Sequence, residues 1–340
     1  MYNFRNSMLL HGAKSEPRFK VSAPLLILIA FAMFYVSQLF ASVPVSIVGG
    51  VLAAIAMSKN GMISDEGEIL ADSEEMIDLL TSVMSTDIVT LISLFATVFM
   101  IVVPIVWCKV AEKRTVASMG FVRKGAIPQY ALGMLVGLMM FSIVYLICVG
   151  TKAISFEGFN GTINVSGLLL FFLAFLVQGA AEEVLIRGFL MLSLGRASTV
   201  FNAVLSSSVL FAFLHSANSG ISLLAFLNIA LFGVFISLYM LRTNNIWGAC
   251  AIHSIWNFAQ GNLFGCLVSG MNVNSSLFIS ESDIARKITN GGDFGPEGGL
   301  AVTIVLLIAV MCVVYIPALK RTDSADEGRK SNTEKEDFKD

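Results

Sequence analysis

The chain has 340 residues, of which 56% are hydrophobic and only 14% charged, and its formal net charge is −2. Soluble domains carry about a quarter charged residues, so this composition excludes an ordinary soluble domain and indicates a polytopic membrane protein. We therefore expect a lipid bilayer around the chain and no nucleic-acid partner.

Several apolar stretches are long enough to cross a bilayer, which takes about 20 residues in a helix. In chain order they are 23–42, 87–108, 127–150, 166–190, 198–216, 221–241, 247–268 and 299–319. We expect an all-α polytopic membrane protein with about eight transmembrane helices bundled around a polar intramembrane cavity. A single transmembrane domain would cover 22–319, with 43–58 as a kinked extension of the first crossing or an interfacial segment.

Charged loops set the expected orientation. Basic residues gather before residue 21 and in the loop 109–126, whereas the loop 59–86 is acidic. Basic loops stay in the cytoplasm, so we expect both termini there and the loop 269–298 outside. The segment 1–21 is then a cytoplasmic basic tail, and 320–340 is a charged, disordered cytoplasmic tail. Apolar residues at near-helical spacing within 69–84 predict a short amphipathic helix on the outer surface.

Two adjacent glutamates lie inside one of the apolar stretches. Ionisable groups in a membrane are costly and mark functional sites, so the region 178–262 is where we expect chemistry. Glu183 and Arg187 are four residues apart and share a helix face, which predicts a supporting ion pair. Glu182 points about 100° away from Glu183, so its carboxylate is free to face a cavity.

Two of the three histidines lie in the following apolar stretches. His215 stands four residues after Phe211, and His253 stands four residues before Asn257, so each pair projects from one helix face. With Glu182 they provide a base for a water molecule and donors for an oxyanion, as amide hydrolysis requires. A zinc site formed by Glu182, His215 and His253 is the alternative, although the HExxH motif is absent.

The three motifs together resemble those of the CPBP intramembrane proteases. This family includes the type II CAAX prenyl endopeptidases and bacteriocin-processing or immunity proteins. The resemblance covers about 166–262 and rests on EExxxR at 182–187, FxxxH at 211–215 and HxxxN at 253–257. It implies an all-α bundle of eight transmembrane helices around a cavity that is open to the membrane and the cytosol. We expect this integral membrane protein in a bacterial cytoplasmic membrane.

Transferred by position, the resemblance implies a role for each residue. Glu182 would be the general base, His215 would help to activate the water, and His253 with Asn257 would form the oxyanion site. Glu183 and Arg187 would support the architecture. We expect a glutamate mechanism without a cofactor, with divalent zinc as the alternative, acting on a peptide or a membrane-anchored protein.

Other functions remain open from the sequence alone. A non-catalytic relative, acting as a bacteriocin-immunity or scaffold protein, would keep the same residues as structural groups. A proton-coupled transporter also needs buried carboxylates and histidines, but we find no paired broken helices of the kind that transporters use. The oligomeric state and the substrate are not specified by the sequence.

The expected depths of Glu182, His215 and His253 in the membrane do not agree with a single shared site. Glu182 and His215 lie about 20–28 Å along their helices from the cytoplasmic turn near Arg196. His253 lies only about 10–15 Å from the turn near Asn244. Helix tilt, or a turn at 242–246 set inside the membrane, would bring the three residues to one level.

Overall fold

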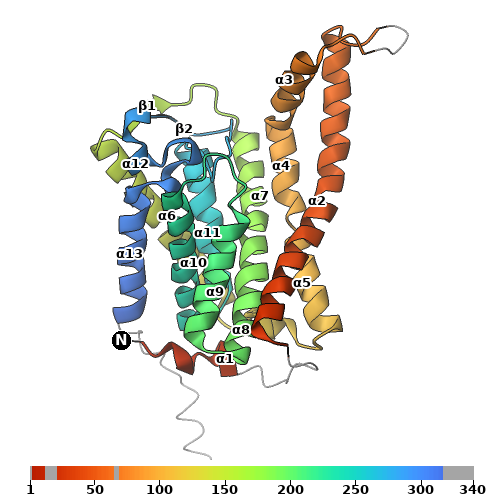
Figure 1. The fold of residues 1–340 in the computed structure, drawn as a ribbon. Helices are drawn as coiled ribbons and strands as arrows, with labels where there is room; N and C mark the ends of the chain where they lie inside the picture. The colour runs from red at the N-terminus through yellow and green to blue at the C-terminus, as the bar shows by residue number, and fades with distance from the viewer. Residues whose placement is uncertain (1, 12–20, 65–68, 317–340) are drawn as a thin grey trace, which may run out of the picture.

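The computed structural model describes residues 2–11, 21–64 and 69–316, and it is predominantly helical. Residues 1 and 12–20 of the predicted basic tail and the whole predicted tail 320–340 lie outside the described residues. The principal elements, shown in Figure 1, are α1 (Met8–His11), α2 (Ala23–Lys59), α3 (Ser73–Met84), α4 (Asp87–Ala96), α5 (Phe99–Val110), α6 (Ala126–Gly150), β1 (Ile154–Phe159), α7 (Val165–Glu183), a π-helical segment (Val184–Met191), α8 (Leu192–Ala197), α9 (Val200–Leu214), α10 (Leu223–Thr243), α11 (Trp247–Phe258), a second π-helical segment (Ala259–Leu263), β2 (Phe278–Ser282), α12 (Lys287–Asn290) and α13 (Leu300–Tyr315).

Five helices within the described ranges are long and apolar enough to cross a membrane. They are α2, α4 with α5, α6, α7 with α8, and α10. The apolar helices α9 and α13 are shorter, and the predicted crossing 247–268 is divided between α11 and the second π-helical segment. The chain is therefore an integral membrane protein with five candidate spans, and the full set of about eight crossings stays a prediction.

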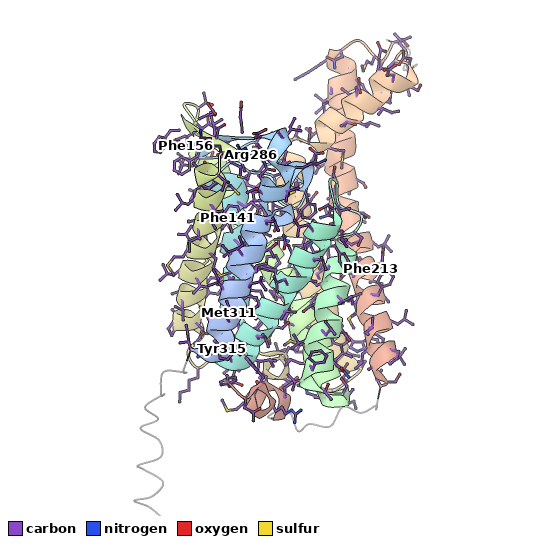
Figure 2. The ribbon with its side chains drawn as sticks, turned by 60° about the vertical axis from the view of Figure 1, so that its left-hand side comes forward. Phe141, Phe156, Phe213, Arg286, Met311 and Tyr315 are labelled. Carbon is purple, nitrogen blue, oxygen red and sulfur yellow. The ribbon has the colours of Figure 1, made fainter. Side chains whose placement is uncertain are left out.

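The outer surface of the bundle is apolar, as a lipid environment requires. Figure 2 places Phe213, Met311 and Tyr315 on the outside, and each of these side chains is more than half exposed. Phe141, in contrast, is completely buried between the helices.

The helix α2 continues far beyond a single crossing. It runs without a break for 37 residues, through Pro44, to Lys59. A helix of this length spans about 55 Å, whereas the hydrocarbon core is about 30 Å thick. The segment 43–58 is therefore an extension of the first helix, and it rises beside α3 above the rest of the bundle (Figure 1).

The prediction of purely helical structure was wrong in one place. Strands β1 and β2 form a two-stranded antiparallel sheet at the end of the bundle opposite α8. The strands are short and come from two loops that are far apart in the sequence. Their pairing depends on the bundle bringing those loops together, so local patterning did not reveal it.

Glycines bring α11 close to both of its neighbours. A Cβ atom built on Gly137 of α6 would stand 2.5 Å from the carbonyl oxygen of Ile252. On the other side, a Cβ built on Gly179 of α7 would stand 2.6 Å from the backbone nitrogen of Ser254. Small residues allow such backbone contact between membrane helices. They hold α11, which carries His253 and Asn257, tightly between α6 and α7.

Candidate active site

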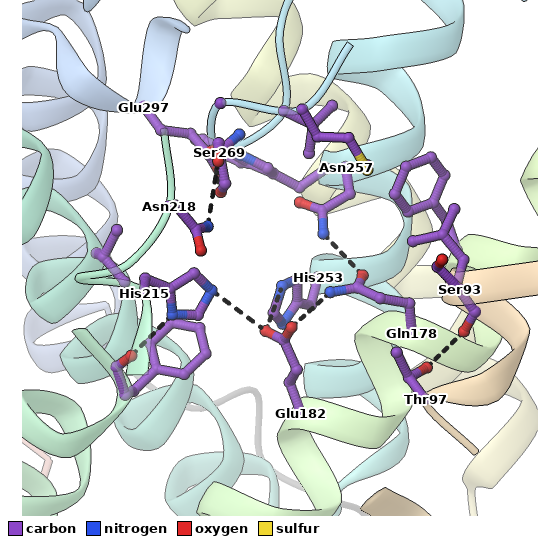
Figure 3. A pocket seen from close by; sticks show the side chains of 18 of the residues that line it. Ser93, Thr97, Gln178, Glu182, His215, Asn218, His253, Asn257, Ser269 and Glu297 are labelled. Carbon is purple, nitrogen blue, oxygen red and sulfur yellow. Dashed lines mark hydrogen bonds and ion pairs between the residues drawn. The ribbon is translucent and has the colours of Figure 1, made fainter. Parts of the chain in front are cut away.

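Glu182 lies in the last turn of α7, immediately before the chain enters the π-helical segment. Gln178, one turn earlier, donates a hydrogen bond from Nε2 to Glu182 Oε1 at 2.7 Å. Asn257 of α11 in turn donates from Nδ2 to Gln178 Oε1 at 2.9 Å (Figure 3). Gln178 therefore links the two predicted residues and fixes one oxygen of the carboxylate.

His215 forms the carboxyl-terminal cap of α9. Its Nδ1 lies 2.8 Å from the carbonyl oxygen of Phe211, one turn earlier. Because a carbonyl only accepts hydrogen bonds, Nδ1 carries the proton and Nε2 has a free lone pair in the neutral ring. That Nε2 lies 3.8 Å from Glu182 Oε2.

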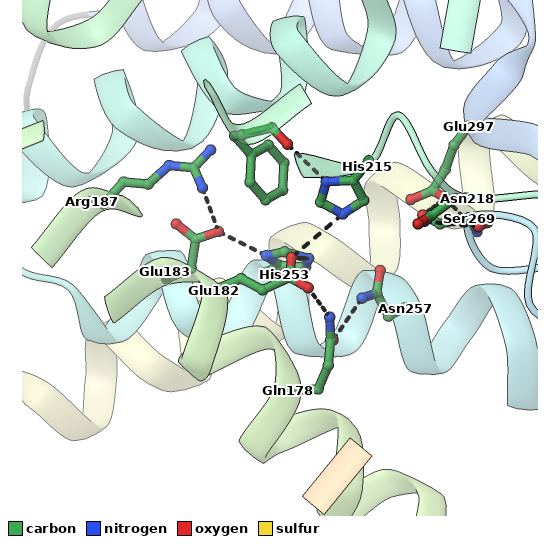
Figure 4. Close-up of polar contacts among 11 residues, drawn as sticks. Gln178, Glu182, Glu183, Arg187, His215, Asn218, His253, Asn257, Ser269 and Glu297 are labelled. Atoms are coloured by element: carbon green, nitrogen blue, oxygen red, sulfur yellow. Dashed lines mark hydrogen bonds and ion pairs between the residues drawn. The ribbon is translucent and has the colours of Figure 1, made fainter. Parts of the chain in front are cut away.

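His253 reaches the same oxygen from α11. Its Nε2 lies 3.6 Å from Glu182 Oε2, and its Nδ1 donates to Glu183 Oε1 at 2.7 Å (Figure 4). Glu182 Oε2 accepts no hydrogen bond from the residues that the structure describes. One carboxylate oxygen thus faces two imidazole nitrogens at distances that a single water molecule bridges.

The predicted ion pair between Glu183 and Arg187 is present and completely buried. Arg187 Nη1 lies 3.1 Å from Glu183 Oε1, and the guanidinium carbon stands 4.4 Å from the centre of the Phe211 ring. Buried charges are tolerated when they are paired, so the two residues cancel each other's charge. Glu183 also accepts the hydrogen bond from His253, so the pair orients that ring.

The turn before α11 is recessed into the bundle, and this places Glu182 and His253 at the same depth. The N–H of Ile246 donates to the carbonyl oxygen of Gly120 at 3.0 Å, and a Cβ built on Gly188 would stand 3.3 Å from Ile246 Cδ1. The turn before α11 therefore lies level with Gly188, well above the end of α8. From that level, Glu182 and His253 are each about 10 Å along their own helices.

A pocket of about 590 Å³ contains Glu182, His215, His253 and Asn257. Its upper wall comes from loops outside the sequence motifs. Glu297 Oε2 accepts hydrogen bonds from the N–H of Ser269 at 2.8 Å and from its hydroxyl at 2.6 Å. Asn218 Nδ2 donates to the Ser269 carbonyl at 3.1 Å. No spacing in the sequence pointed to Ser269 or Glu297, because their positions depend on the tertiary fold.

The described lining of the pocket contains two carboxyl side chains but no lysine or arginine. Glu182 and Glu297 are the only charged side chains among its described lining residues, apart from any charge on His215 and His253.

The sequence left open that three of these residues, Glu182, His215 and His253, bind a zinc ion. Within the described ranges, no group of three or more histidine, cysteine, aspartate or glutamate side chains has an arrangement that could hold a metal ion.

Comparison with known families adds a separate observation. Residues 164–259 match the family model described as type II CAAX prenyl endopeptidase Rce1-like. This match covers less than a third of the chain and agrees with the CPBP resemblance that the three motifs indicated. Searches of curated proteins and of solved structures found no match.

The segment that matches the Rce1-like family model contains all four predicted site residues but only part of the pocket. Glu182, His215, His253 and Asn257 lie within 164–259. Gln38 and Ser42 of α2, with Ser269 and Glu297, lie outside the match and complete the wall. The four predicted site residues thus lie within the matched segment, whereas the wall of the pocket is shared between this segment and the rest of the chain.

Proposed function

We propose that this protein is an intramembrane endopeptidase that hydrolyses a peptide bond of a membrane-associated protein or peptide. The supporting observation is the second oxygen of Glu182, which faces the Nε2 atoms of His215 and His253 at 3.8 and 3.6 Å. The Rce1-like match supports the same class of reaction.

In the proposed mechanism, a water molecule binds between Glu182 Oε2 and the two imidazoles. Glu182 removes a proton as the water oxygen attacks the peptide carbonyl carbon, and it then delivers that proton to the leaving amine. The lone pair on Nε2 of neutral His215 accepts the second water proton in a hydrogen bond and so orients the attack. Gln178 keeps the other oxygen of Glu182 in place.

Asn257 is the proposed oxyanion donor. Its amide has two hydrogens, and the hydrogen bond to Gln178 uses one of them. The other is available to the tetrahedral intermediate, whatever the protonation of the neighbouring rings. His253 donates to an oxyanion only when Nε2 is protonated, because its Nδ1 proton already goes to Glu183.

A Glu182→Gln variant tests this proposal. New peptide termini would be compared in membranes that contain the wild type, Glu182→Gln or the control Glu157→Gln, whose carboxylate is exposed on β1. We expect Glu182→Gln to lose termini that the control retains, with a fall in rate of about 10²–10⁴-fold. Thermal stability in detergent would establish that the variant is folded.

If folded Glu182→Gln leaves all termini unchanged, the peptidase proposal fails. A non-catalytic immunity or scaffold protein then becomes the better explanation. Proton-coupled solute uptake that depends on Glu182 would instead support a transporter.

A further inference from the structure

The pocket contains one carboxylate that the proposed mechanism does not use. Glu297 lies in the short 3-10 turn Pro296–Gly298 that precedes α13, and its partly buried side chain lines the pocket. Within the described part of the chain, it forms no ion pair with a basic side chain. A carboxylate that is partly shielded from water is more favourable when a cation accompanies it. A cationic group that enters the pocket would therefore be stabilised by Glu297.

Only one oxygen of the Glu297 carboxylate is engaged by the protein. Oε2 accepts hydrogen bonds from the N–H and the hydroxyl of Ser269, at 2.8 and 2.6 Å. Oε1 accepts no hydrogen bond from the residues that the structure describes. An ionised carboxylate has about four lone-pair sites, so two bonds to Oε2 leave the other oxygen able to accept. Oε1 is thus available to a ligand in the pocket.

The hydrogen bonds around Glu297 keep this carboxylate in a fixed position. Ser269 has a φ of 49°, a left-handed conformation that costs energy in residues other than glycine. Its N–H and hydroxyl bind Glu297, and its carbonyl accepts from Asn218 Nδ2 at 3.1 Å. Asn228 Nδ2 donates to the backbone carbonyl of Glu297 at 2.8 Å. A carboxylate that is already held in place loses little freedom on pairing, and this favours binding.

Glu297 lies on one flank of Glu182 only. Figure 3 places Glu297 and Asn218 on the side of His215, and Gln178 on the other side. The N–H of Asn218 donates to the carbonyl oxygen of His215 at 3.0 Å, so a single turn leads from His215 to the loop that holds Glu297. On the Gln178 side, the lining residues from α4 are uncharged. An extended peptide that crosses Glu182 therefore meets a second carboxylate on one flank alone.

We propose that Glu297 is a specificity residue, which binds the side chain of a lysine or arginine on one side of the bond to be cleaved. The substrate class is then a peptide segment whose basic residue lies at a constant distance from that bond. The inference rests on the proposed peptidase function for the existence of a cleaved bond. Pairing of a basic side chain with Glu297, in contrast, requires no catalysis.

Peptide binding to an inactive variant tests this pairing without any assay of activity. In Glu182→Gln, Glu297 is the one carboxylate that remains among the described lining residues. The probes are a short apolar peptide, capped at both ends, that contains a single lysine, and the same peptide with uncharged N-acetyl-lysine. We expect the lysine peptide to bind about 10-fold more tightly, the lower range for a hydrogen bond to a charged group, because Glu297 is partly exposed.

Second substitutions in the Glu182→Gln background separate the charge of Glu297 from other effects. Glu297→Gln keeps an oxygen for Ser269 but has no charge, so it should abolish the difference between the two peptides. Asp293→Asn removes a charge from an exposed residue of the same loop that does not line the pocket, and the difference should remain. Ser269→Ala removes one hydrogen bond but keeps the Glu297 carboxylate, so the difference should again remain.

Thermal stability in detergent would establish that each variant is folded, and Glu297→Ala is the substitute if Glu297→Gln is unstable. Equal affinities for the two peptides in Glu182→Gln would overturn the inference. A difference that survives the loss of the Glu297 charge would overturn it as well, because the cation would then bind elsewhere.

The positions of cleavage provide the second test. Termini that are lost in Glu182→Gln should carry a lysine or arginine at a constant distance on one side of the cleaved bond. Glu297→Gln should slow these cleavages about 10-fold, whereas Asp293→Asn should not. Lost termini without such a basic residue would overturn the specificity but leave the peptidase intact. If no termini are lost, the peptidase proposal fails, and peptide binding alone decides whether Glu297 binds a cation.

Discussion

The Nε2 atom of His253 lies 3.6 Å from Glu182 Oε2, although the two residues sit on different helices, α11 and α7. On the other side of the same ring, Nδ1 donates to Glu183 at 2.7 Å. His253 therefore lies between two adjacent glutamates, one facing the pocket and the other neutralised by Arg187. This arrangement connects the carboxylate that faces the pocket to the buried ion pair through a single side chain.

The ion pair predicts a characteristic pattern of stability. Glu183→Gln or Arg187→Met alone leaves an uncompensated buried charge, and each is expected to lower the free energy of unfolding by about 3–5 kcal/mol. The double variant removes both charges and should be more stable than either single variant. Denaturation in detergent measures all three, and equal losses for the single and double variants would argue against a coupled pair.

The close packing of α6 against α11 predicts that a larger side chain at Gly137 lowers both stability and turnover. Gly137→Val places methyl groups against the backbone of Ile252, so we expect a loss of about 1–3 kcal/mol in stability. Turnover should fall as well, because α11 carries His253 and Asn257. Gly150→Val is the matched control, since nothing lies within 4 Å of a Cβ built at that end of α6. Equal effects of the two valines on melting temperature and turnover would contradict this explanation.

Gln178 is expected to act on the rate of the reaction more than on substrate binding. Gln178→Leu removes the hydrogen bond to Glu182 and leaves Asn257 without its acceptor. A hydrogen bond to a charged group contributes about 1.5–3 kcal/mol, which corresponds to a fall in kcat of about 10- to 100-fold. Steady-state kinetics on a cleaved substrate separates kcat from KM, and a change confined to KM would show that Gln178 only contacts the substrate.

A metal-free mechanism predicts insensitivity to chelators. Glu182 supplies the base itself, so prolonged treatment with EDTA or 1,10-phenanthroline should leave the rate unchanged. Elemental analysis of the active protein should find well under one zinc per chain. Loss of activity that zinc restores would instead assign Glu182, His215 and His253 as metal ligands.

The sequence was sufficient to predict those contacts that depend on the geometry of a single helix. The four-residue spacing of Glu183 and Arg187 was enough to predict their ion pair, and the same geometry turned Glu182 away from it. Gln178, one turn before Glu182, was identifiable in the same way. The roles of Glu182, His215, His253 and Asn257 in a reaction stay predictions.

Features that depend on several helices were not predictable. The recessed turn at Ile246 is specified by its contacts with Gly120 and Gly188, which lie on other elements. Similarly, Ser269 and Glu297 reach the pocket because the loops after α11 fold back over it. The extent of α2 was ambiguous because Pro44 disrupts helical hydrogen bonding, yet the helix continues past it.

The hydrogen bond from His215 Nδ1 to Phe211 makes the ring part of the final turn of its own helix. Because a backbone carbonyl fixes the orientation of the imidazole ring, this orientation is only as stable as the last turn of α9. Fraying of that single turn would release the ring from Glu182 while every other contact in the pocket stayed in place. Residues 216–220 follow this turn directly, and all of them except Asn218 are exposed, so we expect substitutions there to change how long the site stays assembled.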